Sequence, residues 1–477
     1  MPTKLPIVAA VLLLPLYAQE TPTEKLAAKS VLEKLNVLEK SIDAHAWVAK
    51  LSAPNAERDA VVARTRELMN SELLALADDI TRNPEIGFVE HRSIAKLTAW
   101  LKRHDFEVEE GVGGLRTAFT ARWTGAAKTS SPVMGIIVEY DALRGTQRNF
   151  HGDQHSAQGP VGLAAAVAIT EFLKKTGTPG TVVVFGTPGE EMMPPNAKRE
   201  MLAAGVFKGV DVFVRSHSSM STNRPAPGFG TCCLNIDGVK YTFSGAPSHQ
   251  MVPWDGRNAL EAVVHFFVNI DSVRASIRPE ARIQGIITEG GAAPNVVPDH
   301  TAADFYIRYP DEVYLEQVRK FVDDSARAAA LATQTKVKID TYGRMRDGIS
   351  VATLGELAFT YEKQFGGTHV EESPGKPQGY EETGGLSSEA PGIGMSVYSS
   401  ASSYHTYGME EDALKEIGHS AFVIDAEAMA AVLHDYAKNP EYREAVKKEF
   451  AGIKALFGEY QAALHKAYPM PNVPDPK

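Results

Sequence analysis

The stretches "PVMGIIVEYDAL", residues 132–143, and "GTVVVFGTPGEE", residues 180–191, decide the fold. Each begins with a short uninterrupted apolar run and continues into carboxylates. Such a run is typical of a strand buried on both faces of a mostly parallel sheet. Helical patterns alternate with these strands, among them "GLAAAVAITEFLKKTG" at 162–177, so we predict an α/β domain. In such sheets ligands bind beyond the carboxyl ends of the strands, where these polar clusters lie.

The order of the predicted secondary-structure elements changes near residue 235. Patterns of strand, helix, strand, strand, helix and strand follow one another, and this βαββαβ order is one complete ferredoxin-like unit. The alternation of α/β elements resumes after about Asp347. The unit is therefore predicted to be an insertion in a domain built from two pieces. The predicted division is a signal peptide (1–18), an N-terminal helical extension (19–66), the first α/β piece (67–234), the inserted domain (235–346), the second α/β piece (347–460) and a C-terminal tail (461–477).

The N-terminal residues have the build of a secretory signal. Lys4 precedes a short apolar stretch from Leu5 to Leu16, and Ala18 stands before polar residues. The stretch is too short to span a membrane stably, and no cysteine stands near it to accept a lipid. We therefore expect a secreted or periplasmic protein, with an uncleaved N-terminal anchor as the alternative. From Thr23 to Met69, apolar spacings near three and four predict an amphipathic helix.

The composition is that of a globular protein, and 477 residues are enough for two domains. A formal charge of −10 opposes general affinity for nucleic acid or anionic membranes. The only cysteines, Cys232 and Cys233, are adjacent. A disulfide between neighbours is geometrically unfavourable, and two cysteines cannot form a thiolate zinc cage.

Several residues that could bind metal ions follow predicted strands. Taken alone, each histidine is most simply structural and each glutamate solvated. Together, imidazoles and carboxylates without thiolates favour a hydrolytic Zn²⁺, Mn²⁺ or Co²⁺ site. Two ions about 3.5 to 4 Å apart need roughly five or six ligands, one of them a bridging carboxylate. The candidates are Asp153, His155, Glu190, Glu191, His217 and His405.

Seven motifs follow one another in the chain: "EYDAL", "HGDQH", "GTPGEE", "RSH", "GAPSH", "GGAAPNVVPD" and a late histidine in a Ser/Thr-rich loop. In this order they resemble the M20 metallopeptidases, and most of all the amidohydrolase branch with aminobenzoyl-glutamate, N-acyl amino acid and auxin-conjugate hydrolases. The resemblance covers about Glu67 to Leu433. It implies a catalytic α/β domain, a dimerisation or lid domain at 235–346, two divalent ions and a homodimer. Zinc is the expected metal, with manganese or cobalt as alternatives.

The resemblance also implies residue roles. Asp153 would bridge the ions, with His155, Glu191, His217 and His405 as the other ligands. Glu190 would be the general base, and Asp141 would orient a metal-binding histidine. His249 would reach a neighbouring active site and stabilise the oxyanion, whereas Asn295 and Arg308 would contact the substrate.

Two segments depart from the family pattern. Relatives of this branch usually have "HACGHN" where this chain has "HGDQHS" (151–156), and an aspartate in place of the cysteine keeps a bridging oxygen available. "EETGGLSSEAP" (381–391) replaces an Asp-containing "STDxG" segment, which affects the expected substrate-side wall rather than the metals. His151 is expected to support the loop without touching a metal.

The predicted function is a metal-dependent amidohydrolase that uses metal-activated water to cleave the amide of an N-acyl or N-aryl amino acid or a short peptide. A dipeptidase or carboxypeptidase on the same scaffold is the first alternative. An inactive, metal-poor ligand-binding protein is the second, and the complete ligand set argues against it. A serine hydrolase or dinucleotide enzyme has no support, since the sequence has neither G-x-S-x-G nor G-x-G-x-x-G after a strand.

Overall fold

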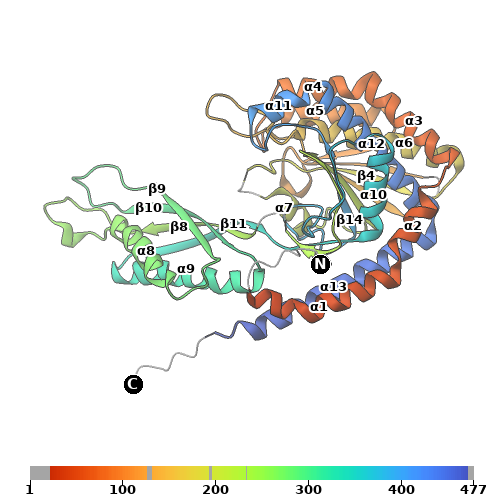
Figure 1. The fold of residues 1–477 in the computed structure, drawn as a ribbon. Helices are drawn as coiled ribbons and strands as arrows, with labels where there is room; N and C mark the ends of the chain where they lie inside the picture. The colour runs from red at the N-terminus through yellow and green to blue at the C-terminus, as the bar shows by residue number, and fades with distance from the viewer. Residues whose placement is uncertain (1–21, 126–131, 193–195, 232–233, 471–477) are drawn as a thin grey trace, which may run out of the picture.

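The computed structural model describes residues 22–125, 132–192, 196–231 and 234–470. They form a larger α/β body and a smaller sheet domain beside it (Figure 1). The predicted signal peptide at 1–18 and the cysteines at 232 and 233 lie outside the described residues. Among the described helices, none is long and apolar enough to cross a membrane.

A six-stranded sheet in the order β1-β2-β4-β3-β5-β14 is the centre of the larger body. β3, β4, β5 and β14 run parallel, and β2 is antiparallel to both of its neighbours. The predicted mostly parallel α/β sheet is therefore confirmed. The strands are β1 (Glu107–Glu110), β2 (Phe119–Thr124), β3 (Val133–Val138), β4 (Thr181–Gly186), β5 (Val212–Ser219) and β14 (Gly392–Tyr398).

Helices pack against this sheet. α6 (His155–Thr176) and α12 (Glu416–Lys438) are buried over most of their length, because small alanines on both helices permit close packing. The other helices of this body are η1 (Met69–Leu73), α4 (Leu74–Arg82), α5 (His91–Arg103), η2 (Val112–Gly114), α7 (Ala197–Ala203), α10 (Ala352–Gln364) and α11 (Tyr407–Ala413). Short strand pairs join β6 (Thr222–Asn223) to β13 (Val370–Glu371) and β7 (Gly228–Gly230) to β12 (Gly348–Ser350).

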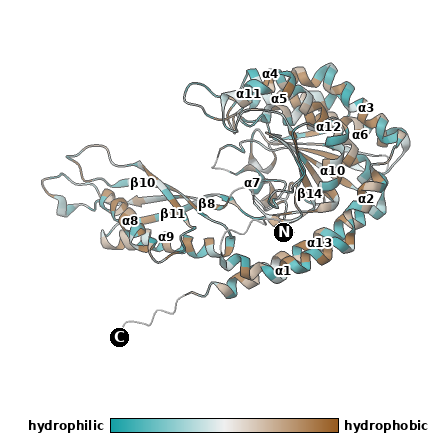
Figure 2. Ribbon diagram, viewed as in Figure 1, coloured by the Kyte–Doolittle hydropathy of each residue, from teal (hydrophilic) through white to brown (hydrophobic). Residues whose placement is uncertain are grey.

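The N-terminal region differs from the single helix expected over 23–69. It forms α1 (Pro22–Ile42), α2 (Ala44–Leu51) and α3 (Ala56–Leu68). Asp43 adopts a left-handed conformation and caps α2, and Asn55 caps α3 through its side chain, so each cap starts a new helix. α1 packs along α13 (Pro440–Ala467), which continues beyond the predicted boundary at residue 460. Teal and brown alternate along both helices in Figure 2, as amphipathic helices with one buried face require.

The inserted domain is the predicted βαββαβ unit. Its sheet has the fully antiparallel order β11-β8-β10-β9, and α8 and α9 pack against it around buried aromatic residues such as Tyr241 and Phe266. This confirms the ferredoxin-like insertion. The elements are β8 (Asn235–Ser244), η3 (Pro253–Asp255), α8 (Ala259–Arg274), β9 (Arg282–Glu289), β10 (His300–Tyr309), α9 (Glu312–Ala332) and β11 (Lys336–Met345).

Candidate metal centre

The predicted ligands gather at one edge of the large sheet. β4, β3, β5 and β14 are neighbours and parallel, so their carboxyl ends meet there. Each strand or the loop after it supplies part of the cluster. Asp141 follows β3, Glu190 and Glu191 follow β4, His217 lies near the end of β5, and His405 follows β14.

Asp153, Glu191 and His405 form one group that could hold an ion. His405 Nε2 lies 3.0 Å from Asp153 Oδ2 and 3.7 Å from Glu191 Oε2. His405 has a positive φ of 58°, and its backbone N–H donates to Gly152 O at 3.1 Å. The loop after β14 is thereby held directly against the loop that carries Asp153.

His155 is oriented from one side by Asp141. His155 Nδ1 lies 3.0 Å from Asp141 Oδ1, and Asp141 Oδ2 accepts the backbone N–H of Glu191 at 2.9 Å. If Nδ1 carries the proton, the lone pair of His155 Nε2 is free for a metal, and Nε2 has no hydrogen-bond partner among the described residues. Burial lowers the pKa of His155, but Asp141 and Glu139 outweigh burial and raise it overall. A cation bound at Nε2 would compete with that second proton.

His217 has the state expected of a neutral ligand. Burial, followed by Arg215 and His155, lowers the pKa of His217 to about 4. His217 Nδ1 lies 3.1 Å from Ser218 O, which leaves Nε2 available. The ring centroids of His155 and His217 are 5.6 Å apart, so the two imidazoles face the same small volume.

The adjacent glutamates complete the cluster. Burial raises the pKa of Glu190 to about 8, with further contributions from Glu382 and Glu139. Burial also raises the pKa of Glu191 to about 9, with Glu190 and Asp153 adding to the shift. Carboxylates crowded in this way need positive charge between them to ionise. The carboxylate oxygens and free imidazole nitrogens therefore fit a pair of divalent ions.

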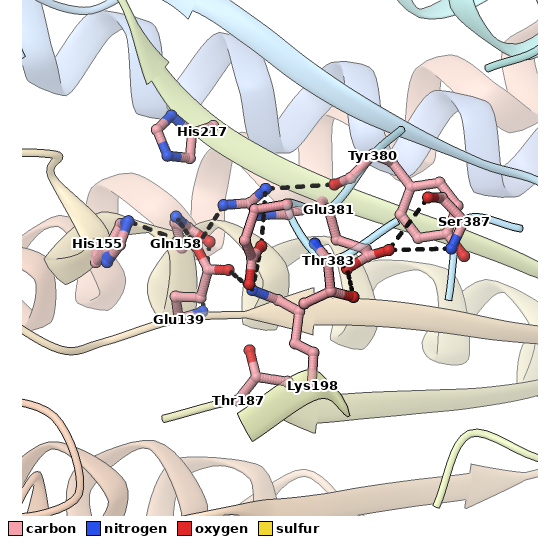
Figure 3. A network of polar contacts seen from close by, with 12 residues as sticks. Glu139, His155, Gln158, Thr187, Lys198, His217, Tyr380, Glu381, Thr383 and Ser387 are labelled. Atoms are coloured by element: carbon pink, nitrogen blue, oxygen red, sulfur yellow. Dashed lines mark hydrogen bonds and ion pairs between the residues drawn. The ribbon is translucent and has the colours of Figure 1, made fainter. Parts of the chain in front are cut away.

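A buried charge network lies beside the cluster, with Glu139 surrounded by His155, Gln158 and Lys198 (Figure 3). Glu139 Oε2 accepts from Arg215 Nη2 at 2.7 Å and from Gln158 Nε2 at 2.8 Å, and Oε1 is paired with Lys198 Nζ. Although burial raises the pKa of Glu139, Arg215 and Lys198 outweigh it and hold the pKa well below its ordinary range. Glu139 can form a group with His155 and His217, but its cationic partners already occupy it.

The departing segment "EETGGLSSEAP" faces this network. Lys198 Nζ donates to both carboxylate oxygens of Glu382 at 2.7 Å. Glu381 accepts hydrogen bonds from the backbone N–H groups of Thr383 and Ser387, at 2.8 and 3.1 Å. Both glutamates are buried or nearly so, which makes them internal anchors of the segment.

The other predicted site residues lie on the inserted domain, which Figure 1 places to one side of the sheet edge. His249 forms an isolated bridge with Val296, and its Nδ1 accepts the backbone N–H of Met251 at 3.1 Å. Asn295 O accepts the backbone N–H of Gln250, and the Arg308 guanidinium lies 5.8 Å from the Tyr306 ring. None of the three belongs to the groups of possible ligands found among the described residues.

Sequence reasoning singled out His151 but missed Glu139, Lys198 and Gln154. The His151 ring is buried, has no hydrogen-bond partner within the described part of the chain, and lies outside the ligand groups. Burial, aided by His155, lowers its pKa to about 3. The position of Glu139 at the same strand end as Asp141 could have drawn attention, whereas Lys198 carries no local pattern that indicates burial.

The chain is similar to several known proteins. Residues 234–334 match the family model described as a peptidase dimerisation domain. The chain is 30% identical over 391 residues to an Xaa-Arg dipeptidase of Mus musculus, covering 79% of this chain and 88% of that protein. It is 32% identical over 279 residues to one of the subunits of p-aminobenzoyl-glutamate hydrolase of Escherichia coli, covering 55% and 56%. A dinuclear metal-binding M20 peptidase from Bacillus subtilis has a similar fold, with TM-score 0.50, 18% identity and coverage of 77% and 99%.

Proposed function

The chain belongs to the M20 peptidase family and is a metal-dependent amide hydrolase, and we propose that two divalent ions bind at the sheet edge. The observation that carries this proposal is the convergence of Asp153, Glu191 and His405 beside His155 and His217. Asp153 is the residue best placed to bind both ions. Its Oδ1 is buried and has no hydrogen-bond partner in the described part of the chain, while its Oδ2 faces His405. We propose zinc as the metal, since imidazole and carboxylate ligands suit it.

The residues of the cluster are proposed to have different roles in the hydrolysis. Two such ions, when bound, lower the pKa of a water and polarise a carbonyl. Glu190 lies beside His155 and Glu191 in a further group of possible ligands, and we propose that it serves as the base instead: its carboxylate would take a proton from that water and deliver it to the leaving nitrogen. Asp141 holds the His155 ring and the Glu191 backbone in place during these transfers.

We propose that the active protein is a homodimer in which His249 reaches the site of the neighbouring subunit. The proposal is supported by the dimerisation-domain match and by an exposed sheet edge at β9, where Ile286 is 65% exposed. Val264 and Val268 add exposed apolar surface on α8. Coverage of these apolar side chains by a partner would remove them from water. The imidazole of His249 could then stabilise the negative charge that develops on the carbonyl oxygen.

The proposed substrates are N-acyl or N-aryl amino acids of the aminobenzoyl-glutamate kind and short peptides. The E. coli relative is a p-aminobenzoyl-glutamate hydrolase, and the mouse relative is a dipeptidase whose length this chain covers to 88%. The latter observation keeps a dipeptidase as the second candidate. In either case Asn295 and Arg308 are proposed to contact the substrate, with Arg308 on a carboxylate. Export through the segment at 1–18 is also proposed, on its charge and apolar pattern.

A substrate panel tests the proposed function. The full chain would be given p-aminobenzoyl-glutamate, an N-acetyl amino acid and dipeptides with C-terminal arginine, each with and without a chelator. Hydrolysis that the chelator abolishes supports the proposal, and the relative kcat/KM values choose between the two substrate classes. Absence of hydrolysis in every metal-supplemented reaction would contradict it.

A further inference from the structure

Gln154 stands between two proposed metal ligands in a conformation that glutamine rarely adopts. Its φ is 53° and its ψ 27°, in the left-handed region, and the residue is almost fully buried. Glycine adopts this conformation without the steric cost of a Cβ atom. A glutamine at such a position is favourable only if its side chain offsets that cost.

The amide of Gln154 clamps the loop that carries His405. Gln154 Nε2 donates to Ser399 O at 3.3 Å, at the start of that loop, and to Met409 O at 2.8 Å, in the first turn of α11 that follows the loop. The backbone N–H of His405 donates to Gly152 O at 3.1 Å between these points. One side chain therefore joins the segment of Asp153 and His155 to the segment of His405.

The oxygen atom of the Gln154 amide, Oε1, has a different environment. Gln154 and Asp425 both line a cavity with about 10 Å³ of room for the centre of a water molecule, next to His217. Gln154 Oε1 and Asp425 Oδ1 are each buried and have no hydrogen-bond partner among the described residues. Asp425 Oδ2 accepts the hydroxyl of Ser216, the residue before His217. The cavity is close to the size that one water requires, and these two acceptors without partners would receive its hydrogen bonds.

We propose that Gln154 and Asp425 form a brace behind the metal centre, completed by one buried water that donates to Gln154 Oε1 and Asp425 Oδ1. The brace links three ligand-bearing segments, those of Asp153 and His155, of His217, and of His405. Gln154 and Asp425 are positioning residues, because they touch neither metal nor substrate. They hold the ligands in the arrangement that the ions need before any ion arrives, and so raise metal affinity. This consequence rests on the proposed metal centre.

The variant Gln154→Gly separates positioning from backbone strain. It removes the steric cost of the positive φ but also the hydrogen bonds to Met409 O and Ser399 O, so the two effects on the Tm of the metal-free protein oppose each other and the Tm should change little. Metal affinity, measured by competition with a chromogenic chelator, should fall about 10-fold or more, as for other residues that support metal ligands. Unchanged affinity in Gln154→Gly would overturn the proposal.

The chain offers a matched control in Gln334→Gly, since Gln334 has a φ of 56° in the inserted domain. This variant removes the same strain and should leave metal affinity unchanged. Asp425→Asn should weaken metal binding in the same direction as Gln154→Gly, and the double variant should lose less than the product of the two single effects, because both act through one water. If the two substitutions lower the metal affinity independently, so that their effects multiply in the double variant, the proposal of a shared water is wrong. If the wild-type chain binds no metal, the proposed function fails. If the wild type binds metal and the variants bind it with the same affinity, only the brace fails.

Discussion

His405 Nε2 lies 3.0 Å from Asp153 Oδ2, although the two residues are 252 positions apart in the chain. β14 pairs with β5 in the sheet, although the whole inserted domain lies between these two strands in the chain. The candidate site is therefore a property of the assembled α/β body. Metal binding is expected to stabilise that assembled state relative to the unfolded chain.

Glu190→Gln is expected to retain metal and lose turnover. Glutamine keeps the shape of the side chain but cannot take the proton, so kcat should fall by about 10²-fold to 10⁴-fold. Metal content measured by elemental analysis should match that of the wild type, since Glu191 rather than Glu190 joins Asp153 and His405. Loss of metal from this variant would show that the roles of the two glutamates are exchanged.

His249→Ala is expected to lower kcat by about 10²-fold, the usual effect of removing one oxyanion donor, without loss of metal. Mixed dimers locate its action. After subunit exchange between His249→Ala and Glu190→Gln chains in equal amounts, one intact site in half of the dimers should restore roughly a quarter of wild-type activity if the dimer is symmetric. Recovery of no activity would mean that His249 does not serve a neighbouring subunit.

Lys198→Met should be strongly destabilising. It leaves Glu139 and Glu382 buried with one fewer cation, and breaking a buried pair costs about 3–5 kcal/mol of unfolding free energy. Urea unfolding would measure this loss. The control is Lys174→Met, which breaks an exposed pair with Asp105 and should cost about 1 kcal/mol or less. Equal effects of the two substitutions would contradict the structural importance assigned to the network.

Glu39 on α1 predicts a pH-dependent difference in stability. Burial and the facing carboxylate of Glu449 raise the pKa of Glu39 from 4.5 to about 9, so the folded chain holds a proton that the unfolded chain releases above pH 4.5. Its contribution to stability is fully present below pH 4.5 and is lost as the pH rises through about 9. Glu39→Gln keeps a donor for Glu449 at every pH. The difference between the Tm of Glu39→Gln and the Tm of the wild type should therefore increase from pH 5 to pH 9, by about 2 °C or more at pH 9.

The control for this series is Glu33→Gln, an exposed glutamate on the same helix. Its Tm difference from the wild type should be constant over that pH range. A Glu39→Gln curve parallel to the wild-type curve would mean that the Glu39 carboxyl is not held protonated.

Periodicity in the sequence was sufficient to predict the inserted domain and most of the catalytic sheet. Buried strands such as β3 and β4 are continuous apolar runs, and the alternation of elements indicates which strands are parallel. The strand order is set by long-range packing, but the rule that ligands lie beyond carboxyl ends placed Asp153 and His405 at one edge without it. The N-terminal prediction missed two breaks, because the capping by Asp43 and Asn55 is local and the apolar spacing continues across it.

The residues that support the site were harder to predict. Lys198 lies in a helical stretch where a lysine is normally exposed, and only the fold brings it to Glu139 and Glu382. Gln154 was noted only as part of a departure from a family motif, because a positive φ leaves no mark in a single sequence. Such contacts depend on burial and on pairing across hundreds of residues, which local patterns do not encode.

Two ions that share Asp153 are proposed to bind at this edge of the sheet. The most direct test is the number of zinc equivalents per chain, measured by elemental analysis after dialysis of the wild type, His405→Ala and Asp153→Ala. A dinuclear site predicts about two equivalents for the wild type, about one for His405→Ala and close to none for Asp153→Ala. One equivalent or less in the wild type, or two in Asp153→Ala, would contradict a dinuclear site bridged by Asp153.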